Sequence, residues 1–418
     1  MAIRDPSCED DIDSASLSCE EALARILAQV APVAGYERLA LRTALGRVLA
    51  ATVHSPFDVP PHTNSAMDGY AMRAADLPAA GQAELRVIGS AFAGRPFAGA
   101  VGPGAAVRIM TGAALPANAD TIIMQEHVAV AGDRITIDGQ HKRGQNVRAA
   151  GEDLRQGQVV LTAGRRLGAP DLGLLASLGQ GEVTVNRRVR VAYFSTGDEL
   201  RSIGEPLGAG EIYDSNRYTL YAMLKRCDAE IIDMGVVRDR RDAVETALRE
   251  AQAMADVVIT SGGVSVGEAD YIKDVLGAIG EVRFWKVAMK PGRPLAFGVL
   301  GNARFFGLPG NPVSVMVTFY QFVLPALLRL AGVVAERPLL LKARTTAVLK
   351  KRPGRREFQR GMLSRTADGE LLVTPTGDQG SGILHSMASA DCFIILDVET
   401  SRVDSGTSVT VQPFQGLL

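Results

Sequence analysis

The chain has 418 residues, of which 47% are hydrophobic and 22% are charged, and its formal net charge is -1. This length exceeds what one ordinary hydrophobic core supports, so several globular domains are expected. The balanced charge shows no basic excess and argues against nucleic acid or an anionic membrane as a partner. The 4 cysteines are scattered without a C-x-x-C pair, which argues against a disulfide framework or a thiolate metal site and is typical of a reducing compartment.

The N-terminal part predicts helices on either side of a β segment. Residues 1–18 are acidic and polar, unlike a basic-then-apolar signal peptide, so we expect a cytoplasmic protein. Ser18 to Glu21 resembles a capping box and predicts a helix, and a second helix is expected over residues 38–49. From about residue 52 to 147, short β-prone runs alternate with Gly, Pro, Asn and Asp, and residues 171–177 predict another helix. A mostly-β module inserted into a helical region is the expected arrangement.

Residues 188–332 alternate between apolar runs and amphipathic segments, which predicts a doubly wound α/β sheet with right-handed crossovers. The expected strands are 189–194, 230–237, a run beginning at 257, 282–289, 294–299 and 304–307. The expected helices are 217–226, 242–254, a segment ending at 279, and 313–330. We expect the last helix to be buried and not to span a membrane, because it contains Gln321 and Pro325. Beyond Pro338, short alternating strands predict a small β domain.

Residues 257–271 are the segment around which the rest of the chain is organised. The apolar run Val257–Ile259 predicts a buried parallel strand, and it ends at Thr260-Ser261-Gly262-Gly263. Glycines let a backbone approach a ligand closely, and the free N–H groups at a helix start favour an anion. The segment therefore predicts a strand-to-helix loop that binds a phosphate or another oxyanion.

Small residues and carboxylates follow four of the predicted strands. In an open α/β sheet, ligands bind outside the carboxyl ends of the strands, and Mg²⁺ prefers carboxylate oxygens together with substrate oxygens and water. The strand ends therefore predict a magnesium site beside a phosphate. Alternatively, Asp198 and Asp239 only cap helices or turns. The segments concerned are Thr196–Glu199, Arg238–Asp239, Ser261–Asp270 and Pro309–Pro312.

Two lysines in the predicted strand 282–289 and its turn indicate an anion site. Lys286 and Lys290 are four residues apart and would point to the same face of a strand, with Arg293 beyond the Pro-Gly turn. Like charges on one face suit an oxyanion clamp. A solvated edge strand is the alternative. The 5 histidines show no zinc-ligand spacing, and no nucleophile-elbow or Walker motif is present.

Seven motifs occur in order along the chain. They are SAMDGYA (Ser65–Ala71), MTGAALPANADTIIMQE (Met110–Glu126), GEDL (Gly151–Leu154), STGDEL (Ser195–Leu200), SGGVSVGEADY (Ser261–Tyr271), FWKVAMKPGRP (Phe284–Pro294) and GLPGNPVS (Gly307–Ser314). This ordered set resembles the molybdenum insertase family (molybdopterin molybdenumtransferases of the MoeA type, with the E domain of gephyrin). The resemblance covers residues from about Ser18 to the C-terminus.

The resemblance implies four domains and an elongated homodimer with each active site between the subunits. The domains would be an N-terminal domain of residues 18–53 and 148–186, an inserted mostly-β domain of 54–147, a molybdopterin-binding α/β domain of 187–337 and a C-terminal β-barrel of 338–418. The implied reaction inserts molybdate into adenylylated molybdopterin and releases AMP in the presence of Mg²⁺. The resemblance also implies a molybdopterin adenylyltransferase and molybdoenzyme chaperones as protein partners. Neither nucleic acid nor a membrane is expected as a partner.

Carried over position by position, the resemblance and the strand ends give the expected site residues. On residue chemistry alone, a structural role is favoured over a functional one for the loops that hold Asp68 and Thr111. The expected catalytic residues are Asp68, Glu199, Asp239, Asp270, Lys286 and Lys290, of which Glu199, Asp239 and Asp270 would hold Mg²⁺. The expected ligand-binding residues are Thr111, Asp153, Ser261, Gly262, Gly263, Ser265, Pro309, Asn311, Arg360 and Ser381.

Two alternatives belong to other functional classes. The same α/β domain occurs in molybdopterin adenylyltransferases and in competence-damage-type nucleotide hydrolases, but the SAMDGYA and C-terminal modules argue against both. An interaction scaffold, like the receptor-clustering E domain of gephyrin, is the second alternative. The intact acids and lysines favour an enzyme.

Overall fold

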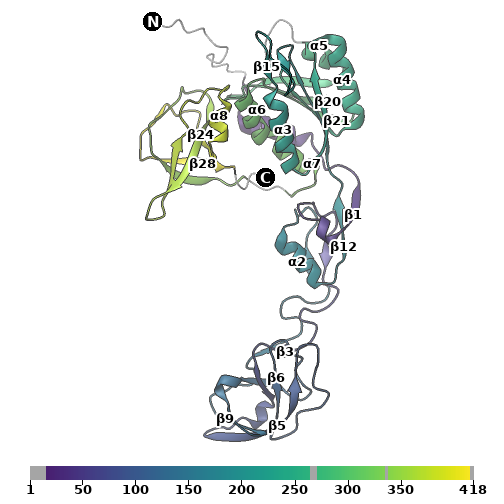
Figure 1. Cartoon of the computed structure of the whole chain (residues 1–418), viewed down its shortest axis with the longest axis vertical. Helices are drawn as coiled ribbons and strands as arrows, with labels where there is room; N and C mark the ends of the chain where they lie inside the picture. Colours follow the sequence, from purple (N-terminus) through teal and green to yellow (C-terminus); the bar gives the residue numbers. More distant parts are fainter. Residues whose placement is uncertain (1–15, 264–270, 335–337, 415–418) are drawn as a thin grey trace.

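The computed structural model describes residues 16–334, apart from 264–270, and residues 338–414, and it shows an elongated chain (Figure 1). A large α/β sheet and a β-barrel lie side by side at one end, and a separate β sheet lies at the opposite end. A narrow neck containing α2 (Ala169–Ser177), β1 (Tyr36–Ala40) and β12 (Glu182–Asn186) connects the two ends.

Helix α1 (Cys19–Ala28) begins at the predicted capping box. The Glu21 N–H donates to Ser18 Oγ at 3.1 Å, and the Ser18 N–H donates to Glu21 Oε2 at 2.8 Å. Ala22 and Ile26, four residues apart on one face, are buried. The helix therefore packs against the core of the α/β region, and the expected start is confirmed.

The second expected helix, over residues 38–49, is wrong. That stretch forms β1 and the short 3-10 helix η1 (Leu41–Thr43), and β1 pairs antiparallel with β12. Exposure along β1 alternates from residue to residue, which is a strand period, and Gly46 has a φ of +78° that a helix cannot accommodate. The pairing partner lies far along the chain, so the local sequence did not reveal it.

The distal end is a six-stranded sheet in the order β7-β4-β6-β5-β9-β8, and it confirms the predicted β segment. Apolar clusters cover both faces, because neighbouring residues such as Ala71 and Met72 point to opposite sides. The short ladders β2–β11 and β3–β10 join the incoming and outgoing chain, so the segment is inserted between two paired strands. The elements are β2 (Val53–His54), β3 (Asn64–Ser65), β4 (Gly69–Met72), η2 (Ala74–Asp76), β5 (Gln82–Ala91), β6 (Ala105–Ile109), β7 (Thr121–Met124), η3 (Gln125–His127), β8 (Ala129–Ala131), β9 (Arg134–Asp138), β10 (Val147–Arg148) and β11 (Val159–Leu161).

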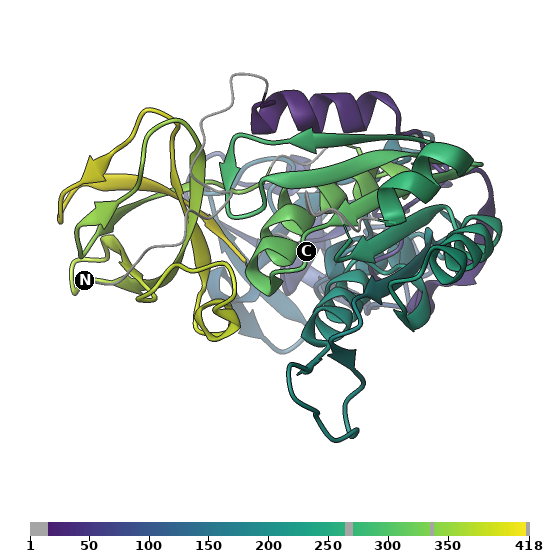
Figure 2. The same cartoon turned by 90° about the horizontal axis from the view of Figure 1, so that it is seen from above.

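The proximal end confirms the doubly wound α/β sheet, whose order is β16-β13-β17-β21-β20-β18. The first four strands are parallel, and β20 and β18 run antiparallel at one edge. Alternate residues of β13 face opposite layers: Tyr193 belongs to the cluster with α3, α6 and α7, and Phe194 to the cluster with α4 and α5 (Figures 1 and 2). The strands are β13 (Arg190–Thr196), β16 (Glu230–Val237), β17 (Val257–Ser261), β18 (Glu281–Lys286), β20 (Pro294–Leu300) and β21 (Ala303–Leu308), with a small parallel pair β14 (Leu200–Arg201) and β15 (Ile212–Tyr213).

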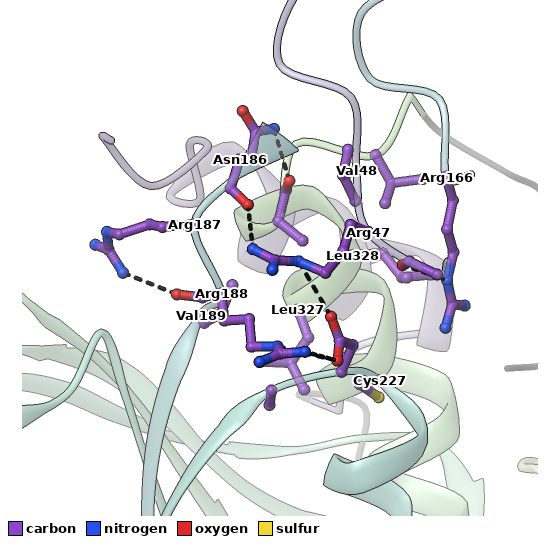
Figure 3. Close-up of a pocket in the computed structure, with 15 residues that line it drawn as sticks. Arg47, Val48, Arg166, Asn186, Arg187, Arg188, Val189, Cys227, Leu327 and Leu328 are labelled. Carbon is purple, nitrogen blue, oxygen red and sulfur yellow. Dashed lines mark hydrogen bonds and ion pairs between the residues drawn. The ribbon is translucent and has the colours of Figure 1, made fainter. Parts of the chain in front are cut away.

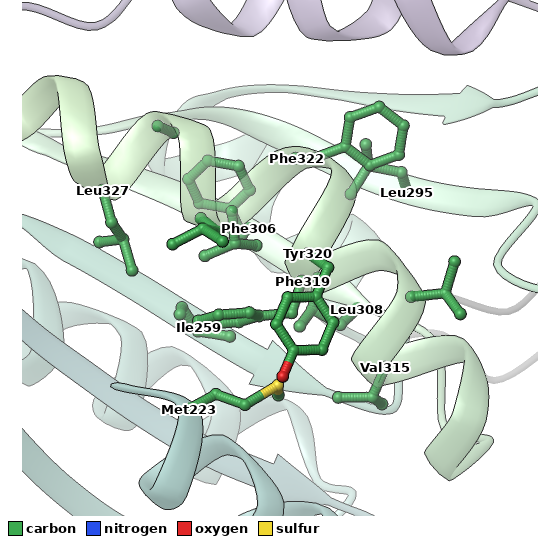
Figure 4. Close-up of a cluster of buried hydrophobic side chains, with 14 of the residues drawn as sticks. Met223, Ile259, Leu295, Phe306, Leu308, Val315, Phe319, Tyr320, Phe322 and Leu327 are labelled. Atoms are coloured by element: carbon green, nitrogen blue, oxygen red, sulfur yellow. The ribbon is translucent and has the colours of Figure 1, made fainter. Parts of the chain in front are cut away.

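Helices cover both faces of this sheet. They are α3 (Ser215–Arg226), α4 (Arg241–Met254), α5 (Tyr271–Ile279), α6 (Pro312–Thr318), the π-helical turn η4 (Phe319–Val323) and α7 (Leu324–Leu330). The last three form one run, Pro312–Leu330, which is long and apolar enough to cross a membrane, but 72% of its most apolar window is buried inside the protein. Its side chains Phe319 and Phe322 pack on Phe306 and Leu295 of the sheet (Figure 4). The apolar side chains of this helical run therefore belong to the hydrophobic core of the α/β region.

The C-terminal part is the expected β-barrel. The strands follow the order β24-β25-β22-β28-β26, and an additional pairing between β26 and β24 closes the ring. The elements are β22 (Leu341–Thr345), β23 (Leu349–Lys350), β24 (Arg356–Arg365), β25 (Leu371–Pro375), α8 (Leu384–Ala388), β26 (Cys392–Leu396), β27 (Arg402–Val403) and β28 (Ser408–Pro413).

The expected strand over residues 282–289 is confirmed as far as Lys286, together with its pairing to residues 294–299, and is wrong beyond Lys286. Strand β18 ends at Lys286 and pairs with β20, whereas β19 (Met289–Lys290) pairs with β24 of the barrel. The segment between them is held outside both ladders: the Leu17 N–H donates to Lys286 O at 2.9 Å, and the Ala288 N–H donates to Leu17 O at 2.7 Å. The two lysines therefore belong to different sheets and do not share one strand face.

Candidate functional site

The carboxyl ends of the parallel strands meet at one edge of the α/β sheet. In the strand register, Ser195 of β13 lies opposite Ser261 of β17, and Ser261 lies opposite Leu308 of β21. Thr196 lies opposite Val237 of β16. The loops that follow these strands are the ones predicted to bind the ligand, so the expected convergence is present.

The loop after β17 depends on glycine. Gly262 and Gly263 have φ angles of +88° and +65°. A Cβ on Gly262 would lie 2.7 Å from Thr196 O, which is closer than atoms pack. Only glycine fits this conformation beside the neighbouring loop. The predicted residues Ser265 and Asp270 lie outside the described residues.

Three carboxylates gather where β13 and β16 end. The Asp239 N–H donates to Asp198 Oδ1 at 3.4 Å. Burial raises the pKa of Asp239, and the negative charges of Asp198 and Glu199 raise it further. Within the described ranges, none of the three carboxylates forms an ion pair with a lysine or arginine. The group therefore carries negative charge that the described side chains do not neutralise.

These acids suit a hard cation. Like charges held near each other favour protonation unless a cation compensates them, and Mg²⁺ needs only one or two carboxylates. Among the described residues there is no group of three His, Cys, Asp or Glu side chains arranged to hold a metal by itself. Glu199 and Asp239 could therefore supply part of a magnesium site, with substrate oxygens and water completing it.

Lys290 lines a cavity of about 470 Å³ at the junction of the α/β region and the barrel. Other lining side chains include Lys350, Glu357, Gln359 and Ser381. Within the part of the chain that the structure describes, the Lys290 side chain makes no hydrogen bond or ion pair. Lys286, at the end of β18, does not line this cavity.

The structure brings Asn311 and Ser381 together across the same junction. Asn311 Nδ2 donates to Ser381 Oγ at 3.1 Å, and the Val313 N–H donates to Ser381 O at 3.1 Å. Asn311 belongs to the Pro309–Pro312 loop that follows β21. Two segments far apart in the sequence therefore meet at the predicted ligand-binding edge.

Arg360 lies behind this junction. Its side chain is fully buried, and its Nε donates to Ser386 Oγ at 3.0 Å while Nη2 donates to Gly380 O at 3.0 Å. Burial lowers the pKa of its guanidinium to about 10. Arg360 does not line the cavity, so its visible action is to hold the loop that carries Ser381.

Asp68 and Thr111 form a separate pair in the distal sheet. Both the N–H and the Oγ1 of Thr111 donate to Asp68 Oδ1 at 2.7 Å, and these bonds lower the pKa of Asp68. The sheet that carries this pair lies at the opposite end of the chain from the α/β sheet (Figure 1). Asp153, whose N–H donates to Val59 O at 3.0 Å, lies in the connection to that distal sheet. One copy of the chain does not bring these three residues to the strand-end site.

A second pocket, between the neck and the α/β region, is structural. Its volume is about 30 Å³, much smaller than the cavity of about 470 Å³ that Lys290 lines. Arg47 is buried there, where it donates to Asn186 O at 2.9 Å and pairs with Asp228 at 3.3 Å (Figure 3). Arg188 also pairs with Asp228 at 2.9 Å. These contacts fasten the neck to the α/β region.

Sequence reasoning missed Asn216, in the first turn of α3. Its Nδ2 donates to Ser261 Oγ at 2.8 Å and to Gly310 O at 2.7 Å. No motif or periodicity marks it, because both partners are distant in sequence. The Asp-Ser-Asn stretch before an amphipathic helix signals a helix start and nothing more.

Comparison with known proteins assigns the family. A relative from Haemophilus influenzae named molybdopterin molybdenumtransferase is 46% identical over 404 residues, which is 96% of this chain and 100% of the relative. The chain belongs to the MoeA family. Family models match in chain order: the MoeA N-terminal region (domain I and II) at residues 17–179, the probable molybdopterin binding domain at 192–329 and the MoeA C-terminal region (domain IV) at 342–414.

Other MoeA relatives agree. A molybdopterin molybdenumtransferase from Nostoc is 37% identical over 379 residues, covering 89% of this chain and 87% of the relative. The crystal structure of the MoeA protein from Pyrococcus horikoshii OT3 has a TM-score of 0.84 at 30% identity, covering 96% of this chain and 100% of that one. A second Pyrococcus MoeA structure has a TM-score of 0.79 at 34% identity, with the same coverage. The resemblance seen in the motifs, the fold class and the expectation of an enzyme are confirmed.

Proposed function

We propose that this MoeA family member inserts molybdate into adenylylated molybdopterin, releasing AMP and forming molybdenum cofactor in a Mg²⁺-dependent reaction. The observation that carries the proposal is the pair of carboxylates Glu199 and Asp239, which no described lysine or arginine neutralises, at the edge of the sheet that also carries the glycine loop after β17. A glycine loop that a ligand can approach closely suits a phosphate group, and carboxylates that no described cation neutralises suit the metal ion that accompanies it.

Each part of this edge has a distinct task in the proposal. Backbone N–H groups of the loop that begins at Ser261 seat the terminal phosphate of the pterin. Glu199 and Asp239, together with Asp270, would hold Mg²⁺. The bound cation would supply Lewis-acid polarisation of the phosphoanhydride and compensate the negative charge on the AMP leaving group.

The lysines serve the second anion. Molybdate is a dianion, and Lys290 lines the cavity that Ser381 also lines. One charge pair at 4 Å is worth about 4 kcal/mol at an effective dielectric of 20, before desolvation. Lys286, at the end of β18, stays in the proposal as a second oxyanion-binding lysine, although it does not line this cavity. Asn311, Ser381 and the Arg360-supported loop shape the cavity around the anion.

We also propose a homodimer in which each active site lies between subunits. The sheet that carries Asp68 and Thr111 is at the far end of the chain from the acids of the α/β sheet (Figure 1). If all these residues serve one reaction, a second copy must supply the distal pair. Asp153, in the connection between them, would contribute with that pair.

The domain boundaries remain a proposal. The four domains would comprise residues 18–53 with 148–186, 54–147, 187–337 and 338–418. Separate sheets with their own apolar clusters support this division. The family resemblance also suggests a cytoplasmic protein that contacts a molybdopterin adenylyltransferase and molybdoenzyme chaperones.

The test is single-turnover AMP release from adenylylated molybdopterin with Mg²⁺, with and without molybdate, scored by reconstitution of a molybdenum apo-enzyme. We expect release that depends on molybdate and yields active reconstituted enzyme. Binding without release would support a scaffold instead. ATP-driven adenylylation of free molybdopterin would assign the chain to the preceding reaction.

A further inference from the structure

The side chain of Asn216 bridges two of the loops at the carboxyl edge of the sheet. It lies two residues after Asp214, whose Oδ1 accepts the Arg217 N–H at 3.1 Å and so caps α3. Asn216 Nδ2 donates to Gly310 O at 2.7 Å and to Ser261 Oγ at 2.8 Å. Gly310 follows β21 and Ser261 ends β17, so one amide group joins the two loops to the start of a fixed helix.

The contacts fix the orientation of this amide. A backbone carbonyl only accepts hydrogen bonds, so the NH₂ group and not the oxygen of Asn216 must face Gly310 O. The same nitrogen reaches Ser261 Oγ, and the hydroxyl oxygen is therefore the acceptor of that bond. The single hydroxyl proton of Ser261 remains available for another acceptor. Among the described residues, no atom accepts it.

The other end of the amide is also without a partner. Asn216 Oδ1 is buried and accepts no hydrogen bond from the described residues. Ser261 is itself 1% exposed, so water does not freely solvate its hydroxyl. Leaving buried polar groups unpaired costs free energy, and such groups often mark a site that a ligand completes. Here a donor and an acceptor stand together at the entry to the Gly262–Gly263 loop.

We infer that Asn216 is a positioning residue that directs the Ser261 hydroxyl proton toward a phosphate oxygen of the bound pterin substrate. It does so by occupying the Ser261 lone pair while it anchors the loop after β21. This inference rests on the proposed function. It adds a residue that acts through Ser261 and touches no reacting atom.

The deciding experiment is a double-mutant cycle with Asn216→Ala, Ser261→Ala and the double variant. The dissociation constant for molybdopterin is measured under anaerobic conditions, alongside the single-turnover rate of AMP release from the adenylylated form. Each single variant should weaken molybdopterin binding about tenfold, the size of one or two lost hydrogen bonds. The double variant should be at most about twofold weaker than the worse single variant, because both substitutions remove the same directed bond.

Additive losses, near a hundredfold in the double variant, would overturn the inference. A loss in the AMP-release rate constant at saturating substrate, with the dissociation constant unchanged, would also overturn it. Asn216→Asp provides a second variant of equal size: its carboxylate cannot donate to Gly310 O, so it should bind at least as weakly as Asn216→Ala. Thermal unfolding of every variant shows whether it is folded.

Thr219→Val is the matched control in the same helix. Among the residues that the structure describes, its hydroxyl bonds the Ser215 carbonyl alone, at 3.1 Å. Binding should stay within about twofold of the wild type, and an equal loss there would mean that α3 responds to any substitution. The proposed function is judged separately by the wild-type chain. If the wild type binds molybdopterin but releases no AMP, the proposed function fails, while the binding cycle still decides the role of Asn216.

Discussion

The amide of Asn311 and the hydroxyl of Ser381 form a 3.1 Å hydrogen bond between the α/β region and the barrel. We expect Ser381→Ala to lower the rate of molybdenum insertion about tenfold, because it removes a polar group from the cavity wall and frees the loop after β21. The rate is measured by apo-enzyme reconstitution. Ser389→Ala is the control, since the Ser389 hydroxyl donates to the His385 carbonyl at 3.1 Å on the exposed end of α8.

Asp239→Asn should lower the turnover rate and raise the thermal stability of the protein. We expect turnover to fall by roughly 10²–10³, the size seen when one preorganised electrostatic group is lost. Because the folded-state pKa of this carboxyl is raised, the wild type loses stability as pH rises through the raised pKa. The variant should therefore melt at a higher temperature than the wild type at pH 7, and the difference should vanish below the usual aspartate range.

Asp242→Asn is the matched control for the expected rise in melting temperature. Its carboxylate pairs with Arg240, and this partner lowers its pKa. The contribution of an acid with a lowered pKa is present at neutral pH and is lost as pH falls, so this variant should not gain stability at pH 7. Near-normal turnover in Asp239→Asn would remove that residue from the proposed site.

Lys290→Ala should lower molybdenum insertion by roughly 10²–10³ with folding intact, because the cavity loses the ammonium proposed to attract the dianion. The loss should be partly recovered at high molybdate concentration, since binding of the anion is what weakens. Lys342→Ala is the control, because its ammonium bonds Thr410 Oγ1 at 2.9 Å on an exposed barrel strand. Equal activity of the two variants would exclude Lys290 from anion binding.

The proposed dimer predicts complementation between inactive variants. Asp68→Asn and Glu199→Gln should each be inactive alone. In a randomly mixed dimer population, half of the molecules carry one copy of each, and one of their two sites is intact. Mixing should therefore restore about a quarter of the wild-type activity.

A mixture of Glu199→Gln with Asp239→Asn provides the control for complementation. Both residues lie at the same edge of one α/β sheet, so a mixed dimer has no intact site and should stay inactive. Recovery in the control, or no recovery in the Asp68 mixture, would contradict a site shared between subunits. Activity is scored by molybdenum insertion in both cases.

Gly262→Ala should destabilise the fold by about 1–3 kcal/mol, because the residue has a φ of +88° and its Cβ would meet Thr196 O at 2.7 Å. Gly210→Ala isolates the backbone effect, since Gly210 has a φ of +82° with open space around it. The difference between the two unfolding free energies, measured in urea, gives the cost of the close approach. Equal costs would show that the loop after β17 can move away from Thr196.

The sequence predicted the features that depend on local pattern. The capping box at Ser18 and Glu21 gave the start of α1, and the alternation of apolar runs gave the doubly wound sheet. Parallel topology then placed the strand-end loops together, so Ser261 and Asn311 could be predicted to lie near one edge. These inferences succeed because each rests on a short segment or on a general rule of sheet topology.

The features that depend on distant pairing could not be predicted. The expected helix over residues 38–49 is replaced at its start by β1 (Tyr36–Ala40), because β12 offers that strand a partner. The segment after Lys286 leaves its sheet because Leu17 binds it. Asn216 carries no local signal, since its partners Ser261 and Gly310 come from other strands. In each case a tertiary contact overrides the local preference of the chain.

The buried Arg47 has a consequence far from its own surroundings. The distal sheet is carried on a narrow neck, and any rotation about the neck displaces a point in proportion to its distance from the pivot, as with a lever (Figure 1). The ion pair of Arg47 with Asp228 sits at that pivot. In the proposed dimer, the position of Asp68 relative to the neighbouring subunit therefore depends on Arg47, which does not line the cavity proposed for the substrate.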